Sequence, residues 1–271
     1  MPVLRKIRGA DMSGLIGKVG IVTAAGSGMG RAGAIRFARA GATVAVVSLE
    51  EEETRETLAL VEAAGGAGLA LAGDLGDENF AREIVDATVE KFGKLDFLWN
   101  HVGYPGPAAV EEIDLAAFDK TVDLNLRSVT VTTSRAIPHL KRSADGNVLF
   151  TSSASGLAGS PWSPVYSMAK FGVVGLMRAL AKKYGPEGLR FNAVCPGSID
   201  TPMLRVFVAR PDDERARGSD AEALSRNAAE AIPLRRLGQP GEVANAALFL
   251  VSEEASFITG VALPVDGGTV A

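Results

Sequence analysis

The chain alternates between short apolar segments and longer segments in which apolar residues recur every three or four positions. The short segments are rich in valine and other apolar residues, which is typical of buried strands. We expect strands at residues 19–23, 43–48, 68–73, 95–99, 147–153, 189–196 and 260–266. The helical periodicity predicts helices at residues 29–40, 51–64, 77–92, 115–141, 163–184 and 240–251.

Strands that alternate with helices build a parallel sheet from βαβ units. The pattern therefore predicts an α/β protein with a doubly wound Rossmann-type fold and a seven-stranded, mostly parallel sheet. The chain has 271 residues without a linker or a tandem repeat, so we expect a single domain over residues 15–271. We expect residues 1–14 to be an N-terminal extension and residues 202–231 to be a mobile lid over the substrate.

Composition narrows the class of protein. With 28 basic and 32 acidic residues, the chain has a net charge of −4, which gives no basic surface for nucleic acid or for an anionic membrane. A single cysteine, Cys195, excludes a disulfide framework and is expected in the core, and two distant histidines make no metal cluster. No signal peptide or membrane span is evident, so we expect a reducing cytoplasm.

A glycine-rich turn follows the first predicted strand and opens the first predicted helix. The turn is TAAGSGMG, from Thr23 to Gly30. Glycines allow the backbone to approach a pyrophosphate, and a helix N-terminus offers free N–H groups and a positive dipole end. Placement between a strand and a helix at the start of a βαβ series therefore favours a dinucleotide site over an ordinary loop.

A tyrosine and a lysine lie four residues apart on the helix predicted over 163–184. Tyr166 and Lys170 therefore share one face of that helix. The phenol of tyrosine has an ordinary pKa near 10, and a neighbouring ammonium group favours the phenolate, which makes proton transfer feasible. Ser153, 13 residues earlier at the end of an apolar strand, is placed to polarise a substrate oxygen, whereas Ser152 is expected to point to the other side.

Together these motifs resemble the short-chain dehydrogenases/reductases over about residues 15–268. The turn resembles the family pattern T-G-x-x-x-G-x-G, although Ala24 stands at its first glycine. An alanine is tolerable there if φ stays negative, so the substitution bears on cofactor affinity and not on the fold. The Ser…Tyr-x-x-x-Lys motif is present, and Asn125 matches the helical asparagine that orders a water beside the lysine. NHVG stands where the family usually has N-N-A-G, so His101 departs from it.

The resemblance implies a set of cofactor-binding residues. Asp74 is expected at the adenine, Lys170 at the ribose, and Thr201 at the nicotinamide carboxamide together with the Ile199 backbone. The full set is Thr23, Ser27, Gly28, Met29, Gly30, Ser48, Leu49, Asp74, Leu75, Asn100, Gly103, Tyr166, Lys170, Pro196, Gly197, Ile199 and Thr201. For His101, a loop histidine in place of the family's asparagine is favoured over a role in proton transfer.

The reaction that these residues imply is the NAD(P)-dependent interconversion of a secondary alcohol and a carbonyl, without a metal. Asn125, Ser153, Tyr166 and Lys170 are the expected catalytic residues. An NADPH-dependent 3-oxoacyl reductase, of the acyl-carrier-protein type, and a nucleotide-binding regulator without chemistry are the alternatives. We expect an apolar pocket for a neutral ring or chain, lined by Tyr104, Ser153, Leu157, Trp162, Met203 and Phe207. Arg205 and Arg210 are candidates for holding a carboxylate, although arginines in a lid are usually solvated.

The residues after the second strand bear on the choice of cofactor. The family's aspartate that selects NAD is replaced by Ser48, and the positions that carry a basic residue in NADP binders are Ser27 and Leu49. Glu50–Glu53 follow, and carboxylates near a 2′-phosphate disfavour NADP by about 1 kcal/mol. We therefore expect NAD. The resemblance also implies a homotetramer, in which Leu176, Met177 and Leu180 extend an apolar surface.

Overall fold

Seven strands form one sheet in the order β3-β2-β1-β4-β5-β6-β7, in a computed structural model that describes residues 14–210, 212–213 and 221–271. The strands are β1 (Val19–Val22), β2 (Thr43–Ser48), β3 (Gly68–Ala72), β4 (Phe97–Asn100), β5 (Asn147–Thr151), β6 (Arg190–Pro196) and β7 (Ala262–Val265). Every neighbouring pair is parallel. The expected doubly wound sheet is confirmed, and among these seven strands it is parallel throughout.

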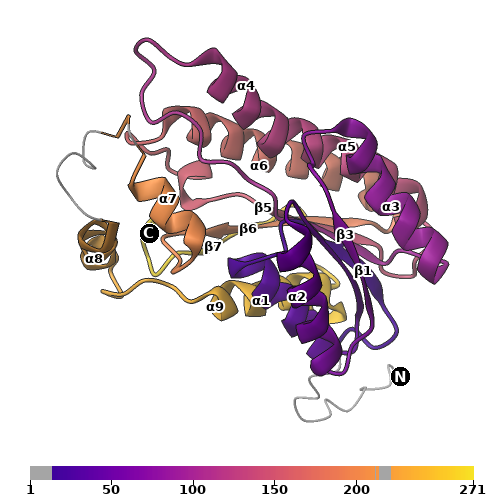
Figure 1. The fold of residues 1–271 in the computed structure, drawn as a ribbon. Helices are drawn as coiled ribbons and strands as arrows, with labels where there is room; N and C mark the ends of the chain where they lie inside the picture. The colour runs from indigo at the N-terminus through magenta and orange to yellow at the C-terminus, as the bar shows by residue number, and fades with distance from the viewer. Residues whose placement is uncertain (1–13, 211, 214–220) are drawn as a thin grey trace, which may run out of the picture.

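Helices cover both faces of the sheet (Figure 1). The helices that the structure describes are α1 (Gly28–Arg39), α2 (Glu51–Ala63), α3 (Glu78–Phe92), α4 (Leu115–Val122), α5 (Ser128–Leu140), α6 (Pro164–Tyr184), α7 (Pro202–Val208), α8 (Ala221–Ala231) and α9 (Pro240–Val251). Helices α3, α5 and α6 lie on one face, and α1, α2 and α9 lie on the other. This placement gives the molecule two separate apolar cores.

Each strand contributes side chains to both cores, because successive side chains of a strand point to opposite faces of the sheet. In β1, Ile21 packs in the core beneath α3, α5 and α6, whereas Val22 packs in the core beneath α1, α2 and α9. In β4, Leu98 and Trp99 divide in the same way. A sheet buried on both faces explains why the sequence shows continuous apolar runs rather than alternation.

The helix expected over 115–141 is interrupted in its middle. Residues Asp123–Arg127 form a π-helical turn between α4 and α5, and Asn125 lies at its centre. The side-chain amide of Asn125 donates to the carbonyl oxygen of Thr121 (2.9 Å), four residues earlier. A single turn of π-helix inside an α-helix is common at functional sites. Apolar periodicity does not reveal such a turn, because it shifts the register by only one residue.

Only β2 has the expected bounds, and the other six strands differ from theirs by one or two residues at one or both ends. β5 ends at Thr151, so Ser152 and Ser153 lie beyond it, although the Ser152 N–H still donates to the Val194 carbonyl (2.9 Å). β4 begins at Phe97, and the buried carboxylate of the preceding residue, Asp96, accepts the Val19 N–H (2.8 Å). The earlier end of β5 places Ser153 in the loop at the carboxyl edge of the sheet.

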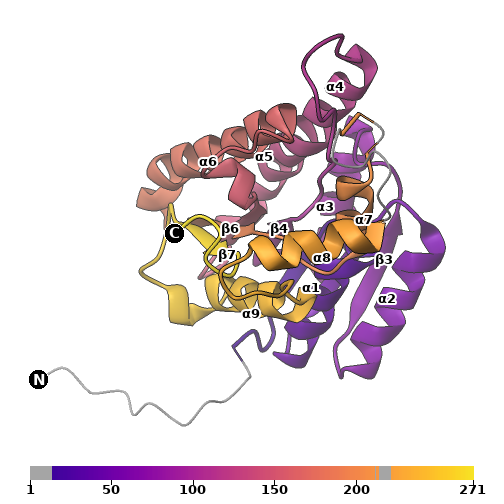
Figure 2. The same cartoon turned by 90° about the vertical axis from the view of Figure 1, so that its left-hand side faces the viewer.

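Helices α7 and α8 lie side by side beyond the carboxyl ends of β6 and β7, as both views show (Figures 1 and 2). They belong to the segment expected as a lid over 202–231, of which residues 211 and 214–220 lie outside the described part of the chain. Most of the expected extension over 1–14 also lies outside it. No helix among the described residues has the length and apolar character needed to cross a membrane.

Candidate active site

The site is built where the order of the strands reverses, between β1 and β4. Ligands of doubly wound sheets bind at this switch point, outside the carboxyl ends of the strands. Here the Thr23 hydroxyl accepts hydrogen bonds from the N–H groups of His101 (2.8 Å) and Val102 (3.1 Å). One buried threonine thus joins the loop after β1 to the loop after β4 and fixes the width of the crevice.

The glycines of the turn stand where a side chain would clash with the protein, and their absence of side chains leaves the backbone open to a ligand's phosphates. Gly28 has a φ of +52°, and a Cβ on Gly30 would lie 2.3 Å from the Ala24 carbonyl oxygen. Helix α1 starts at Gly28 with no side-chain cap and no acidic residue in its first turn. Its N-terminal N–H groups are therefore suited to a pyrophosphate, so the residues present fit a dinucleotide.

Ala24 adopts a backbone conformation that the sequence analysis did not anticipate. Its φ is +50°, in the left-handed region, whereas a negative φ was expected for an alanine at this position. The left-handed region brings Cβ too close to the following carbonyl group, which costs about 1 kcal/mol for a residue other than glycine. The turn therefore keeps the shape that a glycine would favour and carries this strain in its alanine.

A carboxylate lies beside the turn at the end of β2. The position that a Cβ on Gly26 would take is 2.4 Å from the Ser48 hydroxyl oxygen and 2.8 Å from a carboxylate oxygen of Glu53. Arg31 is directed to α2, where it donates to Thr57 (2.9 Å) and to Glu56 (3.1 Å). The charged group nearest to the Ser48 end of the turn is thus an acid from the first turn of α2.

Tyr166 and Ser153 both line the main cavity, where the Ser153 hydroxyl favours the phenolate form of Tyr166 as a hydrogen-bonding neighbour. Ser153 also accepts a bond from the Ser155 N–H (3.1 Å), which fixes its hydroxyl at the start of the loop. The neighbouring Ser152 hydroxyl donates instead to the Lys170 carbonyl (2.9 Å) on α6. The two serine hydroxyl groups therefore have different hydrogen-bond partners, although both residues line the cavity.

Lys170 is almost fully buried and lies below the tyrosine. Its Nζ is 5.4 Å from the centroid of the Tyr166 ring and donates to the Thr151 carbonyl oxygen (3.1 Å). A Cβ on Gly103 would lie 3.1 Å from this Nζ and 3.2 Å from Oδ1 of Asn125. The four expected catalytic residues thus converge on one site, and the absence of a side chain at Gly103 lets two of them approach each other.

Burial dominates the electrostatics of these groups. It raises the pKa of Tyr166 to about 12, against the opposing effects of the Ser153 hydrogen bond and the positive charge of Arg210. Burial lowers the pKa of Lys170 to about 8. The expected lowering of the tyrosine pKa by Lys170 is not found in the protein alone, because desolvation of the phenolate outweighs the groups that favour it.

His101 is part of a hydrogen-bond chain beneath the site. Its Nδ1 lies 2.8 Å from the Thr151 hydroxyl oxygen, which also accepts the indole N–H of Trp99 (2.8 Å). Its ring packs against Trp99 with centroids 4.9 Å apart. Burial, reinforced by the positive charge of Lys170, lowers the pKa of His101 to about 3, so the imidazole is neutral throughout the physiological range.

Some of the residues expected to bind the cofactor have side chains that are hydrogen-bonded within the protein. The Asn100 amide is held by Thr132 (2.7 Å) and Thr133 (2.9 Å) on α5, so only its backbone is left to face a cofactor. The Asp74 carboxylate accepts the N–H of Gly76 (2.8 Å) in its own turn, and Leu75 is buried. Leu49 is 62% exposed directly after β2.

The loop after β6 lies opposite the glycine turn. The Thr201 methyl group is 3.1 Å from the position that a Cβ on Gly28 would take. The Thr201 hydroxyl caps α7 by accepting the Leu204 N–H (3.3 Å). With Met29, Pro196, Gly197 and Ile199, Thr201 lines the main cavity. The structure therefore gathers the predicted nicotinamide-side residues next to Tyr166 and Ser153.

The main cavity has a volume of about 500 Å³. Its lining combines the site residues with apolar groups from α7, α8 and the C-terminus, and among the residues that the structure describes it contains no Asp, Glu, Lys, Arg or His side chain. The expected Ser153, Trp162, Met203 and Phe207 line it, but Tyr104 and Leu157 do not. Leu157 packs against the core, and Tyr104 holds Asn125 through its backbone while Lys120 covers its ring.

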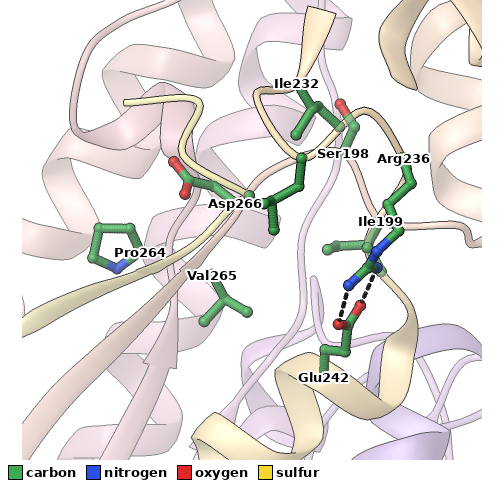
Figure 3. A pocket seen from close by; sticks show the side chains of 11 residues that line it. Ser198, Ile199, Ile232, Arg236, Glu242, Pro264, Val265 and Asp266 are labelled. Atoms are coloured by element: carbon green, nitrogen blue, oxygen red, sulfur yellow. Dashed lines mark hydrogen bonds and ion pairs between the residues drawn. The ribbon is translucent and has the colours of Figure 1, made fainter. Parts of the chain in front are cut away.

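A second cavity of about 260 Å³ lies behind the Ile199 segment and is closed on one side by β7 (Figure 3). Its charged side chains are Arg236 and Glu242, which pair with each other through two bonds of 2.6 and 2.8 Å, and Asp266, which accepts the N–H groups of Gly268 (3.0 Å) and Val270 (2.9 Å). The charged side chains of this cavity are therefore hydrogen-bonded within the protein.

The roles of three residues at the site could not be predicted from the sequence. Thr151 joins His101, Trp99 and Lys170, but a threonine at the end of a strand gives no distinguishing signal. Glu53 was one of four consecutive acids, and only the structure singles it out. Arg210 was considered for a carboxylate and expected in solvent, yet it is 5% exposed. Among the described residues no group of three His, Cys, Asp or Glu lies close enough to hold a metal ion.

Comparison with known proteins shows the family to which the chain belongs. A family model described as "Enoyl-(Acyl carrier protein) reductase" matches residues 23–270. The chain belongs to the short-chain dehydrogenase/reductase family. It is an oxidoreductase, and the expected NAD(P)-dependent interconversion of alcohol and carbonyl is confirmed as the family's reaction.

Individual relatives cover nearly the whole chain. An uncharacterized oxidoreductase of Thermotoga maritima is 38% identical over 94% of this chain and 98% of the relative. Levodione reductase of Leifsonia aquatica is 35% identical over 93% of each chain. A crystal structure of levodione reductase has a TM-score of 0.87 at 33% identity and covers 94% of this chain and 98% of the other. A 3-ketoacyl-(acyl-carrier-protein) reductase from Brucella melitensis, complexed with NADH, has a TM-score of 0.84 at 33% identity, covering 95% of this chain and 100% of the other.

Proposed function

We propose that Tyr166 is the general acid and base of an NAD(P)-dependent alcohol and carbonyl oxidoreductase in which Ser153, Lys170 and Asn125 assist. The observation that carries this assignment is that Tyr166 and Ser153 line the same cavity, with the Lys170 ammonium 5.4 Å from the centroid of the tyrosine ring. A substrate oxygen within reach of both hydroxyl groups would meet two donors at the point where negative charge develops.

In the direction of reduction, a bound nicotinamide cofactor would supply the hydride that the carbonyl carbon takes up. Tyr166 then gives its phenolic proton to the oxygen that takes up the electron pair, and Ser153 donates a hydrogen bond to the same oxygen. With a pKa of about 12, the phenol is fully protonated at neutral pH and is ready to act as the acid. In the direction of oxidation the same phenolic oxygen must take the alcohol proton.

Lys170 and Asn125 would act behind the tyrosine. The Lys170 ammonium is held near the phenol by its hydrogen bond to the Thr151 carbonyl, and it fits there because Gly103 has no side chain. In the proposal this ammonium holds the cofactor ribose and stabilises the phenolate. Asn125 presents Oδ1 to the same gap, because its amide nitrogen is held by the carbonyls of Tyr104 (2.9 Å) and Thr121 (2.9 Å). A π-helical turn is what directs this asparagine inward.

NAD is the proposed cofactor. The NADH complex of the Brucella melitensis reductase supports binding of NAD(H) in this fold. On this chain, the Glu53 carboxylate and the Ser48 hydroxyl lie against Gly26, where the ribose of the adenosine half would sit, and Arg31 is engaged with Glu56. A carboxylate close to a 2′-phosphate costs on the order of 1 kcal/mol, which amounts to a several-fold preference for NAD.

The proposed substrate is a neutral ketone or secondary alcohol with an apolar ring or chain. Support comes from the cavity, whose lining away from Tyr166 and Ser153 is dominated by groups such as Trp162, Met203 and Phe207. Levodione reductase is named for a ketone substrate and is a relative over nearly the full chain. The 3-oxoacyl reductase alternative is favoured by the Brucella melitensis relative, while the four converging catalytic residues oppose a regulator without chemistry.

A homotetramer and a cytoplasmic location are also part of the proposal. The surface of α6 exposes Met168 (47%) and Phe171 (46%), which supports an interface on that helix. Leu176 and Leu180 are partly buried against the core, and Met177, which was expected on the surface, is completely buried. Light scattering at micromolar concentration tests the assembly, since a monomer mass would contradict it.

A substrate panel tests the proposed function. Purified protein would be assayed with NADH and with NADPH against simple ketones, cyclic diketones and a 3-oxoacyl thioester, following cofactor absorbance. We expect the highest kcat/KM with a neutral cyclic or branched ketone and NADH. Turnover confined to the 3-oxoacyl thioester with NADPH would favour the alternative, and binding of cofactor without any turnover would revive the regulator.

A further inference from the structure

Arg210 is a buried cation at the edge of the substrate cavity. It lies two residues after the end of α7, and its side chain is 5% exposed. The guanidinium donates to the carbonyl oxygens of Pro105 (3.3 Å), Gly106 (3.2 Å) and Trp162 (2.7 Å). A buried charge is costly unless hydrogen bonds and a counter-charge compensate it, and the Asp213 carboxylate lies 3.8 Å away.

These bonds connect three separate segments around the cavity. Pro105 and Gly106 belong to the loop after β4, Trp162 belongs to the loop before α6, and Arg210 itself follows α7. A planar guanidinium with five donors is suited to holding several carbonyls at once. A second contact joins the segment after α7 to the loop after β4, because the Asp212 carboxylate accepts the Ala108 N–H (2.6 Å).

The guanidinium also stacks on an aromatic ring of the cavity wall. Its central carbon is 4.2 Å from the centroid of Phe207. The Phe207 ring in turn meets the Tyr166 ring edge to face, with centroids 5.3 Å apart and an interplanar angle of 71°. Arg210, Phe207 and Tyr166 therefore form a continuous stack that ends on the proposed catalytic phenol, although Arg210 is not part of the cavity lining.

We propose that Arg210 is a positioning residue that fixes the wall of the substrate cavity, by holding Phe207 against Tyr166 and by tying the Trp162 loop to the loop after β4. It determines specificity for the carbon skeleton of the substrate without touching the substrate. The inference rests on the proposed function in taking this cavity as the substrate site. A rival role for the same cation is direct binding of a substrate carboxylate, which the three carbonyls and Asp213 oppose.

The first test compares Arg210→Met with Arg205→Met. Methionine keeps apolar volume over Phe207 but removes the charge and every hydrogen bond. Arg205 is a matched control on α7, because it is 58% exposed and pairs with Asp200 (3.2 Å) at the surface. For Arg210→Met we expect kcat/KM for a bulky substrate, cyclohexanol, to fall roughly tenfold or more, since small displacements of a binding wall are expensive. The kcat/KM for propan-2-ol should fall much less, and the Kd of NADH should be unchanged. Arg205→Met should have the same kcat/KM values as the wild type.

Phe207→Leu shows whether Arg210 acts through the ring. If it does, the double variant with Arg210→Met should be little worse than Phe207→Leu alone, because residues in one stack are not additive. Arg210→Lys, which retains the charge and donors but lacks the planar fork, should lie between the wild type and Arg210→Met. It also serves as the test variant if Arg210→Met does not fold.

A readout on the free protein separates this inference from the proposed function. Of the two tryptophans, Trp99 is fully buried and Trp162 is 45% exposed, so quenching by acrylamide reports on the Trp162 loop. In Arg210→Met the quenching constant should rise about twofold as that loop opens more often. If the wild type turns over neither alcohol, the proposed function fails, and quenching still decides whether Arg210 fixes the loop.

Four results would overturn the proposal. These are unchanged quenching, equal losses for both alcohols together with weaker NADH binding, full additivity with Phe207→Leu, and a loss confined to a carboxylate-bearing substrate. The second would indicate general destabilisation, and the last would assign the cation to direct binding.

Discussion

The ammonium nitrogen of Lys170 donates a hydrogen bond of 3.1 Å to the carbonyl oxygen of Thr151, the last residue of β5. The two residues are 19 positions apart in the sequence, one on helix α6 and the other on strand β5. The bond places a buried cation at the carboxyl edge of the sheet, where the same threonine's hydroxyl meets His101 and Trp99. One residue therefore ties the proposed catalytic lysine to the histidine that departs from the family pattern.

Gly103→Ala tests the approach of Lys170 and Asn125. The added Cβ would lie 3.1 Å from Nζ of Lys170 and 3.2 Å from Oδ1 of Asn125, so both groups must shift by a few tenths of an ångström. We expect kcat to fall on the order of tenfold because the proton-transfer geometry is disturbed. Gly175→Ala is the matched control, since its Cβ would meet nothing within 4 Å on α6. Steady-state kinetics check this, and equal activity in the two variants would count against the assignment.

Ala24→Gly tests the strain in the glycine turn. Glycine adopts a φ of +50° without the clash that alanine suffers, although it also gives the unfolded chain more freedom. The two effects oppose each other, and we expect a net stabilisation of up to about 1 kcal/mol. Ala24→Val should destabilise instead, because a β-branched residue tolerates this region worst. Urea unfolding measures both, and a more stable valine variant would show that the turn is not strained.

Glu53→Gln tests the origin of cofactor preference. Removing the carboxylate beside Gly26 should shift the ratio of kcat/KM for NADH over NADPH toward NADPH by several-fold, in line with about 1 kcal/mol. Glu51→Gln is the control, because that residue pairs with Arg55 at the surface. A wild-type enzyme that already prefers NADPH tenfold, or a Glu53 variant that behaves as the control does, would place the selectivity elsewhere.

The pH dependence of reduction should report Lys170 and not His101. An ordinary lysine stays charged to above pH 10, but burial lowers the pKa of Lys170 to about 8, so its positive charge is lost as pH rises through 8. We therefore expect kcat/KM for carbonyl reduction to fall above about pH 8. Burial holds the pKa of His101 near 3, so it stays neutral above pH 5 and His101→Asn should leave the profile unchanged. A new inflection near pH 6.5 that disappears in His101→Asn would refute the neutral state.

Much of the fold was predictable because it depends on local pattern. Apolar runs, glycine punctuation and the alternation of strands with helices identified the seven strands, and the four-residue spacing of Tyr166 and Lys170 identified the site helix. What the sequence could not show arises from contacts between distant residues. The φ of Ala24, the position of Glu53 against Gly26 and the burial of Arg210 all depend on how segments far apart in the chain pack together.

The substrate wall was the least predictable part of the site. Leu157 follows the site loop closely in sequence, yet it packs into the core, whereas Thr269 and Val270 at the C-terminus line the cavity. The π-helical turn at Asn125 was equally hidden, because an apolar periodicity of three to four residues fits both helix types. Motif spacing therefore locates the reacting groups, while tertiary packing selects the residues around them.

Tyr166→Phe tests the central claim most directly. The substitution removes one hydroxyl group and keeps the aromatic ring that meets Phe207, so the cavity and the fold should be preserved. Single-turnover reduction of an accepted ketone would be measured beside the Kd of NADH. We predict a loss in rate of about 10²–10⁴-fold, typical of removing a general acid, with cofactor binding nearly unchanged. A Phe variant that turns over at close to the wild-type rate would contradict the account.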